Sequence, residues 1–141
     1  MDIYLEFIGN HSILFVALLL IIILLLQTLY SDVTRKYKLL TAPEVIGLIN
    51  RDDAVIIDIR SPNEFKEGHI ADAIHIPLSN IKAQSEKLKK YGERPLLFYC
   101  KSGMRADEAC KILSKLGFTN VNALNGGVQS WLDANMPLVK K

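Results

Sequence analysis

The chain has 141 residues, a formal net charge of +2 at pH 7 and a hydrophobic content of 50%. This length is enough for one domain of ordinary size. The mild positive charge is much weaker than the basic surface of a nucleic-acid-binding protein, so we expect no nucleic-acid partner.

The hydrophobic residues are concentrated near the N-terminus, where residues 13–26 form an unbroken apolar run. As a helix, residues 13–29 would be about 26 Å long, close to the lower limit for crossing a bilayer. A signal peptide would have basic residues before the run and a small-residue cleavage site after it, and neither occurs here. The absence of periodicity argues against a buried core helix. We therefore expect a transmembrane helix at residues 13–30, after a short flank at residues 1–12.

The charged residues beside this helix predict its orientation. Residues 1–12 contain Asp2 and Glu6 but no basic side chain, whereas residues 31–38 contain more basic than acidic side chains. The positive-inside rule then places the N-terminus outside and the rest of the chain in the cytoplasm. Because cytosolic thiols stay reduced, the cysteines are not expected to form a disulfide.

Residues 31–38 are expected to form a polar linker or to continue the membrane helix, and after them strand and helix patterns alternate. Short apolar strands are predicted at residues 54–59, 73–76, 96–99 and 121–124, and helices at residues 41–50, 79–91, 105–116 and 127–134. Thr41 and Glu44 have the spacing of a capping box at the start of the first of these helices. Alternating strands and helices indicate an α/β fold with a parallel sheet.

Cys100 directly follows the strand predicted at residues 96–99 and begins a short loop. The rest of this loop is Lys101, Ser102, Gly103, Met104 and Arg105. Since a helix begins where the loop ends, backbone N–H groups and the positive end of the helix dipole should converge on the sulfur. Both effects stabilise the thiolate, which is the nucleophilic form of cysteine. Asp58 and residues 125–127 are expected at the same edge of the sheet, where ligands of such sheets bind.

Each candidate residue also has a structural interpretation. Free cysteines are usually packed and inert, but the position of Cys100 between a strand and a glycine-containing loop favours a reactive role. Cys110 lies on the apolar face of a predicted helix, so we expect it in the core rather than as a resolving thiol. Lys101 either attracts an anionic donor or is a solvated surface residue.

Asp58 and Arg60 are expected to support the site rather than to react. Asp58 lies at a strand end, where its carboxylate can accept backbone hydrogen bonds, and we expect Arg60 to pair with an acid such as Glu64. His69 and His75 do not have the spacing of metal ligands, so we expect structural roles for both and no metal site.

Several sequence pieces, in this order, resemble the rhodanese family of sulfurtransferases. They are residues 55–60, 64–65, 68–70, 73–77, the loop at residues 100–105, residues 124–127 and Trp131. The resemblance extends over residues 39–138 and implies a rhodanese-like domain at residues 39–139, with a central parallel sheet of about five strands and helices on both faces. With the apolar N-terminus, the chain is similar to small, membrane-anchored, single-domain rhodanese proteins of bacterial inner membranes.

The resemblance also implies a chemistry. Cys100 would take sulfur from a donor such as thiosulfate, become a persulfide and pass the sulfur to a thiol or to cyanide, without a metal or organic cofactor. Arg105 would orient an anionic substrate or hold the loop's shape. Cysteine-dependent phosphatases have five residues between cysteine and arginine, and only four separate Cys100 from Arg105. The alternative function is a binding module of the same fold that docks a membrane-protein partner with little turnover.

Overall fold

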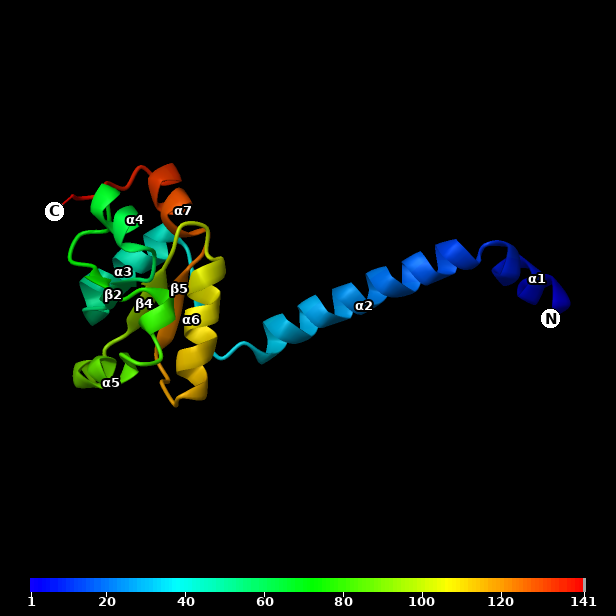
Figure 1. The fold of residues 1–141 in the computed structure, drawn as a ribbon, viewed down its shortest axis with the longest axis horizontal. Helices are drawn as coiled ribbons and strands as arrows, with labels where there is room; N and C mark the ends of the chain where they lie inside the picture. Colours follow the sequence, from blue (N-terminus) through cyan, green and yellow to red (C-terminus); the bar gives the residue numbers. More distant parts are fainter. Residues whose placement is uncertain (141) are drawn as a thin grey trace. The chain divides into compact units, whose positions relative to one another are not determined.

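The structure is a computed structural model that describes residues 1–140 and divides into two compact units at residues 35 and 36. The N-terminal unit contains helices α1 (Asp2–Asn10) and α2 (Ser12–Thr34), shown in blue in Figure 1. An 18-residue stretch of helix α2 has a mean hydropathy of 2.9, and none of the residues of α2 is buried. A helix that is apolar on every side is suited to lipid rather than to water. Its length and composition are those of a membrane anchor or of a signal sequence.

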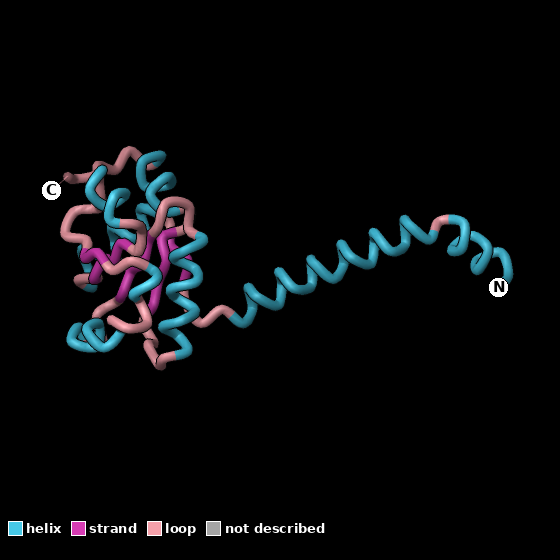
Figure 2. The backbone as a smooth tube through the Cα atoms, in the orientation of Figure 1, coloured by secondary structure: helices cyan, strands magenta, loops and turns pink. Residues whose placement is uncertain are grey.

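A five-stranded parallel sheet forms the centre of the second unit, as the sequence predicted. Its strands are β1 (Lys38–Leu40), β2 (Val55–Asp58), β3 (Ile74–His75), β4 (Leu96–Tyr99) and β5 (Val121–Leu124). Their spatial order is β1-β5-β4-β2-β3, and every neighbouring pair is parallel. Figure 2 shows these strands surrounded by helices and loops. Asp58 ends β2 and Cys100 follows β4, so both lie at the carboxyl edge of neighbouring strands.

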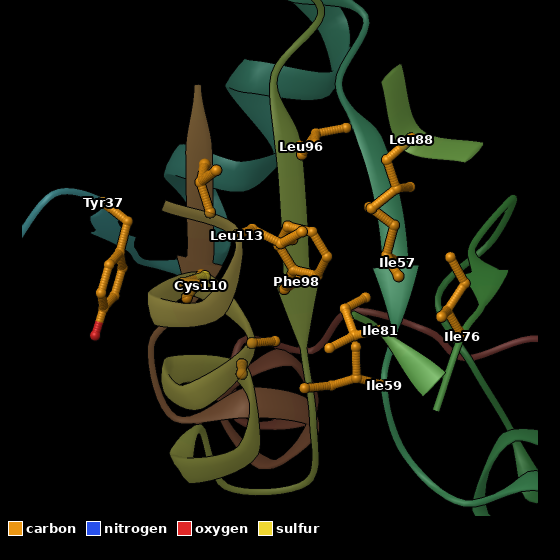
Figure 3. Packing of buried hydrophobic residues seen from close by; sticks show 14 of the residues in the cluster. Tyr37, Ile57, Ile59, Ile76, Ile81, Leu88, Leu96, Phe98, Cys110 and Leu113 are labelled. Carbon is orange, nitrogen blue, oxygen red and sulfur yellow. The ribbon is translucent and has the colours of Figure 1, made fainter. Parts of the chain in front are cut away.

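Both faces of the sheet are covered, which explains why the strands read as continuous apolar runs. On one face, α3 (Ala42–Asp52) and α7 (Gly127–Asp133) pack through Val45, Val128 and Trp131 against Leu97. On the other face, α5 (Ser85–Leu88) and α6 (Met104–Lys115) pack against Ile57 and Phe98 (Figure 3). Successive strand residues point to opposite faces of the sheet, so Leu97 packs in the hydrophobic core on one face and Phe98 in the core on the other.

The prediction of one continuous helix at residues 79–91 is wrong. The segment contains short 3₁₀ turns at Leu78–Asn80 and Lys89–Tyr91, with only the four-residue α5 between them. The hydroxyl of Ser85 donates to the carbonyl of Lys82 at 2.8 Å, a local bond that competes with helix formation. Ile81 and Leu88 are buried in the core, so tertiary packing anchors the segment at separate points.

The predicted capping box at Thr41 and Glu44 is also wrong. The Thr41 hydroxyl donates to the Glu44 carboxylate at 3.0 Å, and it makes no capping bond to the backbone. A complete capping box forms instead at Ser61 and Glu64, where it begins the short helix α4 (Pro62–Glu67). This helix was not predicted from the sequence, although its Ser-Pro-Asn-Glu start carries the required spacing.

Two further elements differ from the sequence analysis. Strand β1 was not predicted, and it pairs with β5 so that Leu40 lies opposite Leu124. The strand expected at residues 73–76 is limited to Ile74–His75. Both are edge strands, whose short length leaves little periodic signal in the sequence.

Candidate active site

Cys100 begins the loop that joins β4 to α6, and its side chain lies under the rest of that loop. Its Sγ accepts hydrogen bonds from the backbone N–H groups of Gly103 at 3.0 Å and Ala106 at 3.4 Å. Helix α6 begins at Met104, so its positive end is directed at the same atom. The convergence of N–H groups expected from the sequence is therefore observed. Cys100 itself is 0% exposed, which places the sulfur under the loop rather than at the surface.

The turn between β5 and α7 supports this loop from behind. The backbone N–H of Val128 donates to the Cys100 carbonyl at 2.8 Å, and that of Gln129 donates to the Lys101 carbonyl at 3.3 Å. Because these carbonyls point outward to α7, the loop's N–H groups are free to face the sulfur. A Cβ at Gly127 would lie 2.4 Å from the Cys100 oxygen, so only glycine permits this close approach.

Arg105 and Glu64 form a two-pronged ion pair at the end of the loop. The Nη1 and Nη2 atoms of Arg105 donate to the Oε1 and Oε2 atoms of Glu64 at 3.0 and 3.1 Å. These hydrogen bonds lower the pKa of Glu64 to about 2. They also raise the pKa of Arg105 above its ordinary value. The pair ties the end of the loop to α4.

Arg60 pairs with an acid, as expected, but that acid is Asp58 and not Glu64. Its partner is the fully buried carboxylate of Asp58, which accepts from Arg60 Nε at 3.0 Å and from Nη2 at 2.7 Å. Burial opposes the charge of Arg60, but the hydrogen bonds and charge of Asp58 outweigh this effect and raise the pKa of Arg60. The side chain of Arg60 turns inward because a buried carboxylate must be paired.

Asp58 also orders the neighbouring chain, as expected from its position. It accepts the backbone N–H of Arg60 at 2.9 Å and the hydroxyl of Tyr99 at 2.8 Å. The Tyr99 hydroxyl in turn accepts the N–H of Ile70 at 3.1 Å, and Arg60 donates to the Gly68 carbonyl. Burial, followed by the nearby Asp58 charge, raises the pKa of Tyr99. Tyr99 was not identified from the sequence, where it read only as a strand residue.

Two histidines, His69 and His75, pack against one aromatic ring of α4. Phe65 lies between His69, at a centroid distance of 3.9 Å, and His75, at 4.7 Å. His69 Nδ1 also lies 2.9 Å from the Phe65 carbonyl, and His75 Nε2 lies 2.8 Å from the Arg60 carbonyl. Both rings therefore have structural roles beside the site.

The remaining predicted residues separate into core and surface. Cys110 is buried in the core, where its thiol donates to the Asn122 carbonyl at 3.6 Å and burial raises its pKa. Lys101 and Ser102 are exposed, and Met104 is 81% exposed. Two surface hollows, both lined in part by Arg94 and Asn120, lie near the amino ends of β4 and β5, which is the opposite edge from Cys100.

Known proteins have a similar sequence and fold. The sequence model of the rhodanese-like domain matches residues 41–134. The chain belongs to the rhodanese-like domain family. Its fold resembles the crystal structure of a rhodanese-related protein from Thermoplasma volcanium with a TM-score of 0.63 and 31% identity, covering 74% of this chain and 100% of that one.

Curated relatives extend the rhodanese similarity. The uncharacterized protein YibN of Escherichia coli is 38% identical over 136 residues, which covers 96% of this chain and 95% of YibN. The thiosulfate sulfurtransferase GlpE of Coxiella burnetii is 35% identical over 95 residues, which covers 67% of this chain and 87% of GlpE. The similarity to YibN therefore includes the apolar N-terminal region, whereas the similarity to GlpE covers a shorter part of the chain.

Replacing Gly127 by alanine is expected to disturb the Cys100 loop. The φ of Gly127 is +62°, and the added Cβ would clash with the Cys100 carbonyl. Gly92, with φ +60° and no atom within 4 Å of an added Cβ, is the matched control. We expect Gly92→Ala to lower the free energy of unfolding by about 1–2 kcal/mol and Gly127→Ala to lower it further. Urea unfolding of residues 36–141 measures both, and equal losses would contradict the close contact.

Replacing Asp58 by alanine is expected to lower the free energy of unfolding by about 3–5 kcal/mol, because Arg60 is left buried without its carboxylate. The control is Glu86→Ala, which breaks the exposed pair with Lys89 and should cost less than about 1 kcal/mol. The same unfolding experiment compares the two variants. A variant at Asp58 as stable as the parent would show that the buried pair is not needed for the fold.

Proposed function

We propose that the protein is a membrane-anchored sulfurtransferase that moves sulfane sulfur from a donor such as thiosulfate to a thiol or cyanide acceptor. The observation that carries this proposal is the position of Cys100 Sγ beneath the N–H groups of Gly103 and Ala106. Those donors stabilise negative charge on Sγ, which favours the nucleophilic thiolate form of Cys100. A sulfurtransferase relative, GlpE, supports the same reaction class.

In the first half of the proposed cycle, the Cys100 thiolate attacks the outer sulfur of thiosulfate. The sulfur–sulfur bond of the donor breaks, and sulfite leaves with the electron pair. The product is a Cys100 persulfide, whose terminal sulfur an acceptor thiolate or cyanide then attacks, which regenerates the Cys100 thiolate. Each half-reaction exchanges one sulfur atom and needs no cofactor.

The burial of Cys100 adds a requirement to this cycle. Since the residue is 0% exposed, a donor cannot reach Sγ unless the loop moves. We infer that residues 101–105 open during transfer, with Lys101, Ser102, Gly103, Met104 and Arg105 forming the substrate-binding loop. Lys101 and Met104 are already at the surface, where they would meet the donor or acceptor first. In the proposed site, Asp58 and Arg60 support this loop from the strand ends.

The small size of the loop favours sulfur transfer over phosphate chemistry. Four residues lie between Cys100 and Arg105, and the N–H groups of Gly103 and Ala106 are directed at the sulfur itself. A phosphoryl group would require a wider ring of donors to reach its oxygens. The geometry is therefore better suited to one additional sulfur atom.

We further propose that residues 13–30 span the bacterial inner membrane, with the N-terminus outside, a linker at residues 31–38 and the rhodanese-like domain at residues 39–139 in the cytoplasm. The support is the apolar, unburied surface of α2 and the basic residues that follow it. The reducing cytoplasm would keep the Cys100 thiol available for sulfur.

The burial of Cys100 is also the one observation that favours a second candidate, a rhodanese-fold binding module that docks a membrane-protein partner with little turnover. A sulfur that stays covered would leave the surface of the loop as the functional element. Persulfide formation separates the two candidates.

Treatment of the full-length protein with thiosulfate is expected to add one reducible sulfur atom to Cys100. Intact-mass measurement before and after reduction detects it. Cys100→Ser should abolish the added mass, whereas Cys110→Ala, which alters only a buried core thiol, should retain it. If the parent gains no sulfur from thiosulfate or from a small persulfide, the sulfurtransferase proposal fails and the binding module remains.

A reporter fused after Lys141 is expected to show that the C-terminus is cytoplasmic, because basic residues follow α2 and none precedes it. The measurement compares a reporter active only in the periplasm with one active only in the cytoplasm. High periplasmic activity would reverse the orientation. Release of a shortened soluble protein would instead identify α2 as a cleaved signal sequence.

A further inference from the structure

The ion pair at the end of the Cys100 loop has the form of an occupied oxyanion site. Arg105 presents two parallel N–H groups, and each binds a different oxygen of Glu64 at 3.0 and 3.1 Å. A planar guanidinium recognises carboxylate, sulfonate and phosphate oxygens through this same fork. The carboxylate of Glu64 therefore occupies the position that two oxygens of an external oxyanion would take on Arg105.

Glu64 is held in this position by its own helix. Its Oε1 accepts from the Ser61 hydroxyl at 3.1 Å and from the Ser61 backbone N–H at 3.4 Å, within the capping box of α4. With a pKa lowered to about 2, the carboxylate is charged at neutral pH. The oxyanion mimic is thus pre-oriented and charged at neutral pH.

The pair is close to the sulfur and open to solutes. Arg105 precedes Ala106, whose N–H contacts Cys100 Sγ, and the charge of Cys100 contributes to the raised pKa of Arg105. The side chains of Arg105 and Glu64 are 36% and 28% exposed, so an ion from solution can compete for the fork. Lys101, the other cation of the loop, is exposed and is not part of the ion pair.

We propose that Glu64, by occupying the oxyanion-binding fork of Arg105, is a specificity-determining residue that disfavours oxyanion donors. This inference rests on the proposed sulfurtransferase function. Thiosulfate must displace Glu64 before its sulfonate oxygens reach Arg105. A persulfide without an oxyanion delivers its sulfur without that displacement.

Two donors test this difference, because both add one sulfur to Cys100. With thiosulfate, the thiolate takes the outer sulfur and sulfite leaves with the electron pair. With 2-hydroxyethyl persulfide, the thiolate takes the terminal sulfur and 2-mercaptoethanol leaves as the thiol, carrying the proton. Only the first donor has oxygens that need Arg105.

The central variant is Glu64→Gln in the full-length protein in detergent. Glutamine keeps the size of the side chain and an oxygen for Ser61 but removes the charge that holds Arg105. We expect the KM for thiosulfate to fall about fivefold to tenfold, because thiosulfate no longer has to break a charge-assisted contact between Glu64 and Arg105. The rate with 2-hydroxyethyl persulfide should stay within about twofold. Glu67→Gln, at the exposed end of the same helix, is the matched control and should change the kinetics with neither donor.

Two further variants identify the role of Arg105. Glu64→Asp shortens the carboxylate, should break the two-pronged contact and should change the KM for thiosulfate in the same direction. Adding Arg105→Gln to Glu64→Gln should remove the gain for thiosulfate. Circular dichroism melting of each variant confirms that the chain is folded under the assay conditions.

Sulfate binding supplies a readout that does not depend on transfer. Titration calorimetry should show tighter sulfate binding to Glu64→Gln than to the parent. Equal sulfate binding by variant and parent, or an equal change in transfer kinetics with both donors, would mean that Glu64 only supports the loop, and would overturn the inference. In that case, persulfide formation by the parent would still support the proposed function. Absence of a persulfide with either donor, together with tighter sulfate binding to the variant, would reject the proposed function and retain the oxyanion subsite.

Discussion

The buried carboxylate of Asp58 is the constraint on which the arrangement of this site depends. It is fully enclosed at the end of β2, so its charge must be paired and its oxygens must accept hydrogen bonds. Arg60 and Tyr99 meet that requirement, and through them the bonds reach Gly68 and Ile70. The segment between β2 and β3 is thereby held against the end of β4, where the Cys100 loop begins.

This held segment carries α4, and α4 carries Glu64. The capping box orients the carboxylate of Glu64 toward Arg105, and Arg105 ends the Cys100 loop. The buried charge of Asp58 at the end of β2 and the partly exposed ion pair of Glu64 and Arg105 are therefore linked through one short helix. The same helix brings Phe65 between the rings of His69 and His75, which adds aromatic packing beside the site.

The loop itself divides its backbone groups between two directions. Its carbonyl oxygens at Cys100 and Lys101 bond to the start of α7, and its N–H groups at Gly103 and Ala106 bond to the sulfur. Backbone N–H groups that face one point form an anion-binding concavity without any charged side chain. In this loop, the sulfur is stabilised by backbone geometry, whereas Arg105 is engaged by Glu64. That division separates the part of the site that holds sulfur from the part that could recognise the rest of a donor.

Local patterns in the sequence were sufficient for the strands at β2, β4 and β5 and for the apolar helix α2. Continuous apolar runs between turn residues can be read directly, because each residue's environment follows from its immediate neighbours. The position of Cys100 was predictable for the same reason, since a strand, a glycine-containing loop and a helix start are adjacent in the chain. The parallel sheet then brought Asp58 and Cys100 to one edge.

The choice of partners required the folded chain. Arg60 was expected to pair with an acid such as the nearby Glu64. It pairs instead with Asp58, because a buried carboxylate must have a partner of opposite charge, and Glu64 pairs with Arg105, 41 residues away. The contact of Gly127 with the Cys100 carbonyl and the interrupted segment at residues 79–91 also depend on packing against distant strands. Sequence patterns report how each residue suits its neighbours along the chain, whereas pairing depends on which side chains the sheet brings within a few ångströms and on how little water reaches them.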